Sequence, residues 1–231
     1  MKKDTKIPDR AINILKDIQV PIHAQISGLN MFLETSTSNL SPEDLDYFKL
    51  MQNSAANLFR IVEIYNWVHK IEAKRKIRLN YIQFDFVKYL DKILDEFRIV
   101  FKYYNLKLEF RYRKEIFIYA DVKKLRVALE CILFAAIENA YKNTTLQITI
   151  IARNNNLQFQ IRNKSDYMEP KLVDCLFDKE KPKYRSPYHS NRVVSYGFFV
   201  AKEIIHTHFG SMIAQSYEDN VNIFGFNIPI K

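Results

Sequence analysis

Between residues 8 and 34, apolar residues recur at steps of three and four, at Leu15, Ile18, Ile22, Ile26, Leu29 and Leu33. This spacing predicts an amphipathic helix that packs its apolar side against other helices. Pro21 lies inside the pattern. An interior proline normally kinks a helix at a cost of ~3 kcal/mol, so a proline kept there indicates a helix with a special role.

A second helix is predicted from residue 42 to about residue 74, after a polar linker. Ser41 is suited to cap its start, Pro42 to occupy the first helical position, and Glu43 and Asp44 to face the positive end of the helix dipole. Two long helices joined by a short linker form a hairpin. Two such hairpins from two chains would bury both apolar seams in a four-helix bundle, which predicts a homodimer. Alternatively, the hairpin packs only on the C-terminal part of its own chain.

From residue 77 onwards the chain alternates between helical and strand patterns. Strands are expected at 77–85, 106–112, 116–120, 146–152, 157–163, 212–215 and 223–229. Helices are expected at 86–104, 121–143, 170–177 and 196–208. Helices gathered on one face of a mostly antiparallel sheet make an α+β sandwich, which is the fold class predicted for residues 77–231.

The net charge and the hydropathy of the sequence limit the classes of partner that we expect the protein to bind. The net charge of +9 favours acidic partners, but the basic residues are spread along the chain, as on an ordinary solvated surface. Only the stretch 179–192 gathers basic and aromatic residues, so nucleic-acid binding is not expected, although this loop remains a candidate docking site. The sequence contains no run of eighteen apolar residues, so we expect no membrane span and a cytoplasmic protein.

Glycine is scarce: the chain has four, at Gly28, Gly197, Gly210 and Gly225. Average usage would give about sixteen. Loops that cradle phosphate depend on glycine, because the backbone must approach the ligand closely and adopt positive φ. The composition therefore offers little material for a nucleotide lid.

The first helix resembles the dimerisation and phosphotransfer helix of sensor histidine kinases, which carries His-Glu-x-x-x-Pro before an apolar repeat. With Pro21 on the family proline, Lys16 stands where the phosphate-accepting histidine should be and Asp17 on the acidic position. The resemblance extends over residues 11 to 231. It implies that residues 1–76 form the helical hairpin and residues 77–231 an ATP-binding domain of the type shared with gyrases and Hsp90-type chaperones.

The nucleotide motifs of that family are largely missing. Along the long helix from Asp121, the two family asparagines become Cys131 and Ala135, and the second is the one that holds Mg²⁺ in the family. Magnesium prefers oxygen ligands, which a methyl group does not provide. Asn139 repeats the motif one turn later, so it is either a displaced metal ligand or simply a polar residue at the helix end.

The next two motifs are also degenerate. The family's Asp-x-Gly-x-Gly, whose aspartate bonds the adenine amino group, becomes Asn163, Ser165 and Tyr167. Asn163 could still accept one hydrogen bond through its carbonyl oxygen. Of the two glycines expected before a later helix, only Gly197 remains. Asn139, Asn163 and Gly197 are thus vestiges of a nucleotide site, and we expect no cofactor and no metal.

These residues predict an inactive histidine kinase homologue. It would act as a dimeric scaffold that binds a kinase or response regulator through Lys16, Asp17, Gln19 and His23 on the first helix. An alternative is a histidine phosphotransferase that relays phosphate without ATP. His23 lies two turns after Lys16 and would be the acceptor, because phosphotransfer needs an exposed imidazole near neutral pKa.

Overall fold

The computed structural model describes the backbone of residues 9–36, 40–74, 76–111, 115–178 and 192–230. The basic loop singled out at 179–192 therefore lies, except for Arg192, outside the described residues. The chain divides into two compact units, Met1–Arg75 and Lys76–Lys231. No helix in the described ranges combines the length and the apolar character that crossing a membrane requires.

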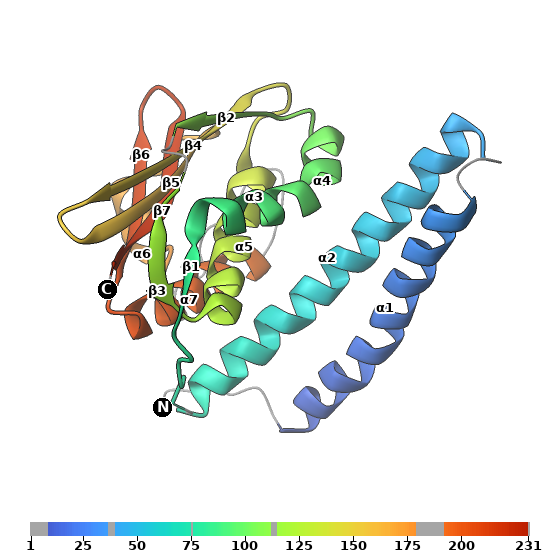
Figure 1. The fold of residues 1–231 in the computed structure, drawn as a ribbon, viewed down its shortest axis with the longest axis horizontal. Helices are drawn as coiled ribbons and strands as arrows, with labels where there is room; N and C mark the ends of the chain where they lie inside the picture. The colour runs from blue at the N-terminus through green and yellow to red at the C-terminus, as the bar shows by residue number, and fades with distance from the viewer. Residues whose placement is uncertain (1–8, 37–39, 75, 112–114, 179–191, 231) are drawn as a thin grey trace. The chain divides into compact units, whose positions relative to one another are not determined.

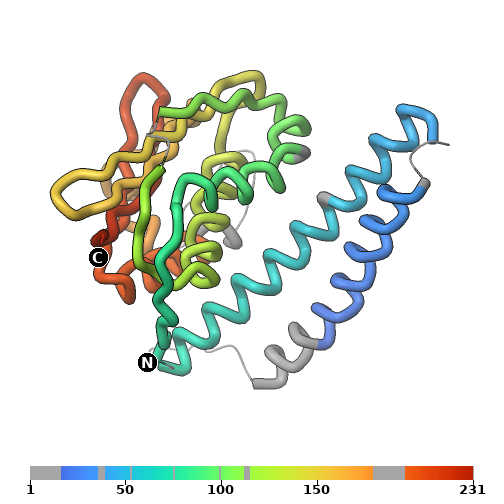
Figure 2. The backbone as a smooth tube through the Cα atoms, viewed as in Figure 1, coloured from blue at the N-terminus to red at the C-terminus, as the bar shows by residue number. Residues whose placement is uncertain are grey.

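The first unit is a hairpin of two helices that lie side by side (Figures 1 and 2), α1 at Asp9–Ser36 and α2 at Pro42–Glu72. Both predicted helices are confirmed, and α1 continues through Pro21. At the start of α2, the Ser41 hydroxyl accepts a hydrogen bond from the Asp44 backbone N–H at 3.1 Å and donates to the Asp44 carboxylate at 2.6 Å. The local cap chemistry read from the sequence therefore fixes where this helix begins.

The second unit is built on a mixed five-stranded sheet, in the order β2-β4-β5-β7-β6 (Figure 1). Its strands are β2 at Lys107–Arg111, β4 at Thr145–Arg153, β5 at Asn156–Lys164, β6 at Ser211–Tyr217 and β7 at Val221–Pro229. The pair β2 and β4 is parallel, and the other neighbours are antiparallel. Asn154 and Asn155 take positive φ in the β4–β5 turn, as their residue types favour.

A separate two-stranded ribbon pairs β1 at Ile82–Asp85 with β3 at Phe117–Ala120. The helices of this unit are α3 at Phe86–Glu96, α4 at Arg98–Tyr103, α5 at Val122–Asn139, α6 at Pro170–Cys175 and α7 at Arg192–Thr207. Helices α5 and α7 pack on each other and on strands of the sheet (Figure 1). Alternate residues of β4 and β5 are buried, which places the core between these helices and one face of the sheet. The predicted α+β class is thus confirmed.

Arg126 ties two of these helices together. From α5, its guanidinium donates to both carboxylate oxygens of Glu96 in α3, at 3.2 and 2.5 Å, and to Glu130 one turn further along α5 at 2.7 Å. These carboxylates raise the pKa of Arg126. A planar guanidinium that bonds both oxygens of one carboxylate fixes orientation as well as distance, so this contact holds α3 in register on α5.

Several predicted boundaries were wrong. The strand expected to begin at residue 77 begins at Ile82. The single helix expected at 86–104 breaks at Phe97, a buried residue that ends α3 and precedes α4. The helix expected to reach residue 143 ends at Asn139, because the Tyr141 N–H instead bonds the Lys164 carbonyl oxygen of β5 at 2.8 Å. Helix α7 begins at Arg192 and not at Tyr196, so Gly197 lies within it. An interior glycine costs about 1 kcal/mol relative to alanine, which tertiary packing readily overrides.

Candidate functional site

A buried polar cluster lies where β5 ends and β7 begins, beside α5. Asn163 follows Leu157, Phe159 and Ile161 on the buried face of β5, and Asn222 lies on β7 opposite Asn163 in the register. Both asparagines are buried, and so is Ser165. Because buried amides need partners, the hydrogen bonds of these three residues, the asparagine cluster, define the chemistry of this site.

The two asparagines share Ser165 as an acceptor. The Asn163 side-chain nitrogen donates to the Ala136 carbonyl oxygen at 2.9 Å and to the Ser165 hydroxyl oxygen at 3.3 Å. The Asn222 side-chain nitrogen donates to the same hydroxyl and to the Asp166 carbonyl oxygen at 2.9 Å. Within the described residues, the side-chain oxygens of both asparagines are buried without a hydrogen-bond partner. The site therefore retains two buried acceptors.

The rim of the cluster is closed by the chain's own contacts. The Tyr141 hydroxyl donates to the Asp166 carboxylate at 2.6 Å, and the Ser165 N–H donates to the Asn220 carbonyl oxygen at 3.0 Å. Met168 is buried, and its N–H donates to the Ser216 hydroxyl at 2.8 Å. Tyr167, in contrast, is exposed. The segment 165–168, where the resemblance leads us to expect a glycine-rich motif, is thus bonded to β6, to β7 and to the chain after α5.

The position that the resemblance assigns to the magnesium ligand is apolar. Ala135 in α5 is fully buried. Asn139, the last residue of that helix, donates from its side-chain nitrogen to the Ala135 carbonyl oxygen at 2.6 Å, which serves the helix end. The described residues contain no group of three or more His, Cys, Asp and Glu side chains placed to hold a metal ion. At the position that the resemblance assigns to the magnesium ligand, α5 therefore presents a methyl group and no side-chain oxygen.

A second buried cluster joins Asp121 to His208. Asp121 precedes α5, and its carboxylate accepts from the Asn80 N–H at 2.8 Å, the Lys124 N–H at 3.0 Å and the Lys124 ammonium at 2.6 Å. Its backbone N–H donates to His208 Nε2 at 3.1 Å, while His208 Nδ1 lies 2.8 Å from the Ile204 carbonyl oxygen. Nε2 must therefore be unprotonated and Nδ1 must carry the proton.

The pKa values of this cluster follow from its geometry. Burial lowers the pKa of His208, because the charged imidazolium would be desolvated in the interior. The pKa of Asp121 is also lowered: burial acts to raise it, but the hydrogen bonds from Asn80 and Lys124 outweigh that effect. The pair is thus a neutral histidine beside an ionised carboxylate, and it holds the start of α5 against the segment after α7.

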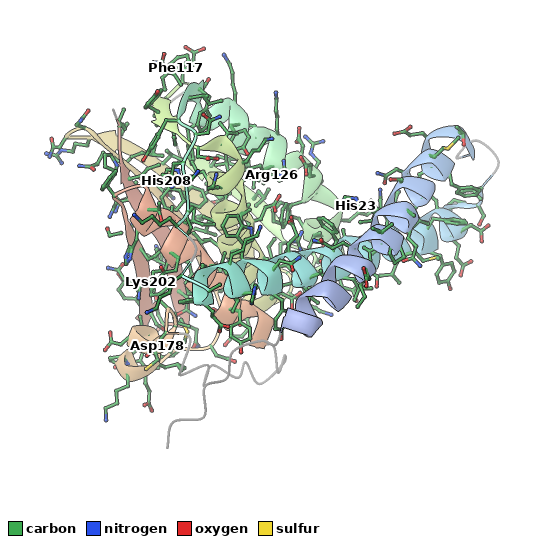
Figure 3. All side chains as sticks on the ribbon, turned by 90° about the horizontal axis from the view of Figure 1, so that it is seen from below. His23, Phe117, Arg126, Asp178, Lys202 and His208 are labelled. Atoms are coloured by element: carbon green, nitrogen blue, oxygen red, sulfur yellow. The ribbon has the colours of Figure 1, made fainter. Side chains whose placement is uncertain are left out.

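Four residues on α1 were expected to bind a partner. Asp17 and His23 are exposed and Gln19 is half-buried, whereas the side chain of Lys16 lies outside the described part of the chain. The His23 ring meets the Phe59 ring of α2 edge-on, with centroids 4.3 Å apart. Figure 3 shows His23 on the helical unit and His208 within the C-terminal unit. His23 is therefore an accessible imidazole that one face of the hairpin helps to orient.

The structure brings some of the predicted site residues together and separates others. Asn163 and the Ala135–Ala136 turn of α5 are neighbours, as the nucleotide motifs imply. Gly197 is buried inside α7 and does not lie in a loop before it. Sequence reasoning missed Asn222, although a signal was present: it shares the alternation of Phe224, Phe226 and Ile228, so a polar residue stood on a buried strand face.

No protein-family model matches this sequence, and no curated protein matches it either. Solved structures do. The chain is similar to the Acinetobacter baumannii histidine kinase AdeS, at 19% identity and a TM-score of 0.60, over 93% of this chain and 98% of that one. It is also similar to histidine kinase ThkA in complex with response regulator protein TrrA, at 17% identity and a TM-score of 0.60, over 95% of this chain and 61% of ThkA.

A third similar structure is full-length ShkA in complex with AMPPNP, at 13% identity and a TM-score of 0.65, over 96% of this chain and 46% of ShkA. The chain thus spans about half the length of ShkA and nearly all of AdeS. At these identities the likeness is one of architecture: a helical hairpin followed by an α+β unit. The chain therefore has the fold found in these histidine kinases.

Proposed function

We propose that this protein is a catalytically inactive histidine kinase homologue that acts as a dimeric scaffold and binds a kinase or response regulator. The observation that carries the proposal is the apolar, fully buried side chain of Ala135 at the magnesium position. A hard divalent cation needs oxygen ligands, and phosphoryl transfer from ATP relies on that cation to neutralise developing charge. Without a ligand there, the fold is retained and its reaction is lost.

The asparagine cluster supports the proposed loss of the nucleotide site at the positions that would bind adenine. Asn163 offers one buried acceptor, but a neutral amide oxygen bonds more weakly than a carboxylate. Ser165 replaces a family glycine and its hydroxyl is engaged by both asparagines. The segment that should stay open for the base is bonded to its own sheet. These residues do not fit Mg·ATP.

The proposal combines the loss of the phosphate-accepting histidine with the loss of the nucleotide site. A labelling experiment tests the two losses separately. The purified chain and its Lys16→His variant, which restores the family acceptor, are incubated with Mg²⁺ and γ-labelled ATP. Both are expected to remain unlabelled, since restoring the acceptor does not restore the nucleotide site. Labelling of the wild type would contradict inactivity altogether. Labelling of Lys16→His alone would show a working ATP-binding unit and overturn the nucleotide half of the argument.

The partner surface is proposed on α1, around Asp17, Gln19 and His23, with Lys16 from the same helix. Asp17 and His23 are exposed, which docking requires. ThkA, a protein with the same fold, is known in complex with a response regulator. The proposed partner of the present chain is therefore a protein of that class or a kinase that pairs with it.

The exposure of His23 supports a second candidate function. A histidine phosphotransferase needs an accessible imidazole on a helical hairpin, and His23 meets that requirement. If it is the acceptor, a small phosphodonor such as phosphoramidate should give an acid-labile phosphoryl group on the wild type and on His69→Gln, but not on His23→Gln. Equal labelling of the two variants would exclude His23.

A further inference from the structure

A hollow of about 450 Å³ opens on the face of the sheet that points away from the core. Gln147 of β4 and Arg162 of β5 stand opposite each other in the register and line it. Both alternate with the buried residues Leu146, Ile148 and Ile161, which face the helices. The hollow therefore opens on the opposite side of the sheet from the core. Asn163 also borders it, although the Asn163 side chain is bonded to Ala136 in α5.

The walls of this hollow are positively charged. Arg111 of β2 and Arg162 and Lys164 of β5 line it, and no Asp or Glu does so among the described residues. Within the described chain, no carboxylate lies within 4.0 Å of the charged groups of these three side chains. Glu109, on the same strand as Arg111, instead accepts from the Gln147 amide at 2.9 Å. Three cations thus converge without a carboxylate in contact to neutralise them.

The other lining groups are polar and small. Asn143 and Thr144 line it from the turn that enters β4, and Thr145 is the first residue of that strand. The Thr144 hydroxyl donates to the Tyr141 carbonyl oxygen at 2.5 Å, so the Asn143 amide nitrogen and the Thr145 hydroxyl are the donors left for a ligand. Asn143 takes a φ of 63°, the left-handed conformation that asparagine tolerates, and its side chain is hydrogen-bonded to Asn105. The turn is thereby anchored on the segment before β2, so these polar groups are held in place around the cations.

We propose that this hollow binds a small anion that carries at least two phosphate groups. Arginine forks and a lysine ammonium are the groups that recognise phosphate oxygens, and amides and hydroxyls complete such sites. Its volume suits a small molecule. No aromatic ring is among the described residues that line it, so a nucleobase would find no stacking partner there. The recognised chemistry is the phosphate groups, on the face of the sheet opposite to the one that packs against the helices.

Calorimetric titration with inorganic pyrophosphate tests this site. The variants are Arg162→Gln and Lys164→Gln inside the hollow, and Arg153→Gln as a matched control. Arg153 is another exposed arginine of the same β4–β5 hairpin, at the opposite end of β4 and outside the lining. Removing either cation of the hollow should weaken pyrophosphate binding about tenfold or more, because each supplies a charge-assisted hydrogen bond to phosphate. Arg153→Gln should bind as the wild type does, and all variants should keep its melting temperature.

Three outcomes would overturn the proposal. One is the absence of saturable binding at millimolar pyrophosphate. Another is an equal weakening in Arg162→Gln and Arg153→Gln, which would mean a diffuse basic surface. The third is tighter binding of citrate, or of a single-stranded oligonucleotide, than of pyrophosphate, which would assign the hollow to another ligand class. Because no labelling by ATP is involved, the result is independent of the proposed function.

Discussion

Single polar residues on buried strand faces distinguish this chain from a generic α+β domain. Asn163 and Asn222 each donate twice through the amide nitrogen and leave the amide oxygen unpaired within the described residues. An unpaired buried acceptor costs ~1–3 kcal/mol, so these oxygens require an account. The proposed inactive nucleotide site supplies one, because these oxygens would then be acceptors left without a ligand.

His208 makes the stability of the C-terminal unit depend on pH. Burial lowers the folded-state pKa of His208 below the ordinary value of 6.5, and its Nε2 must stay unprotonated to accept from Asp121. The stabilisation is therefore fully present above pH 6.5 and is lost as the pH falls towards the lowered pKa. The surrounding charges are Asp121, which favours protonation, and Lys124, which opposes it.

We therefore expect the free energy of unfolding to fall between about pH 7.5 and about pH 5.5 more steeply in the wild type than in His208→Gln. The difference in slope is at most about 1.4 kcal/mol per pH unit, the limit for one proton. Urea unfolding across this range measures it. His206→Gln, an exposed histidine two residues away, is the control and should keep the wild-type slope. Identical slopes in wild type and His208→Gln would contradict the assigned protonation state.

At the scale of elements, what the sequence predicted well was what local chemistry decides. The start of α2 follows from Ser41 and Asp44, neighbours in sequence, and the β4–β5 turn follows from two asparagines that tolerate positive φ. The features that the sequence did not predict depend on contacts between residues that are far apart in the sequence. The break between α3 and α4 falls at Phe97, whose ring is buried, and the early end of α5 accompanies the hydrogen bond from Tyr141 to Lys164.

The same distinction between local and long-range contacts applies to the candidate site. Asn163 was singled out from the sequence because it stands in a stretch that resembles a family motif. Its partner Asn222 was not, because it reaches Ser165 from 57 residues away through the pairing of β5 with β7. The parallel pairing of β2 with β4 and the Asp121–His208 contact are equally non-local. Spacing along the chain constrains what a residue can do, but the identity of its partner comes from the sheet register.

The cap of α2 gives a prediction at this scale. Replacing Ser41 with alanine removes the acceptor for the Asp44 N–H and should reduce the stability of the helical unit by about 1 kcal/mol. Ser54→Ala, an exposed serine in the middle of the same helix, is the matched control. It should stabilise the helix slightly, since alanine has the higher helix propensity. Urea unfolding followed by far-UV circular dichroism measures both. Equal effects would show that Ser41 does not act as a cap.

At the scale of the molecule, the helical hairpin leaves many large apolar side chains exposed to solvent. Val20 is 71% exposed and Met31 69%, and Ile18, Tyr47, Leu50, Met51 and Leu58 are also exposed. Soluble proteins rarely leave so many large apolar side chains open unless another surface covers them. The proposed partner is a second copy of the hairpin, since two hairpins can bury their seams in a four-helix bundle.

Analytical ultracentrifugation tests this assembly. The wild type should sediment as a dimer, and Leu58→Glu should shift it to a monomer, because a charge in a buried seam is unfavourable. Ile151→Glu is the control: it changes a similarly exposed apolar residue of β4, in the other unit, and should leave the dimer intact. A wild type that sediments as a monomer would contradict the dimeric scaffold.

The central claim is that this fold no longer uses Mg·ATP, and calorimetric titration of the purified protein with Mg·ATP tests it most directly. With Ala135 in place of a metal ligand and the asparagine cluster bonded to its own sheet, we predict no saturable heat attributable to magnesium: ATP with and without Mg²⁺ should behave alike. Arg162→Gln, run in parallel, removes any contribution from the basic hollow. Micromolar binding that requires Mg²⁺ and survives Arg162→Gln would contradict the account and point to a working kinase.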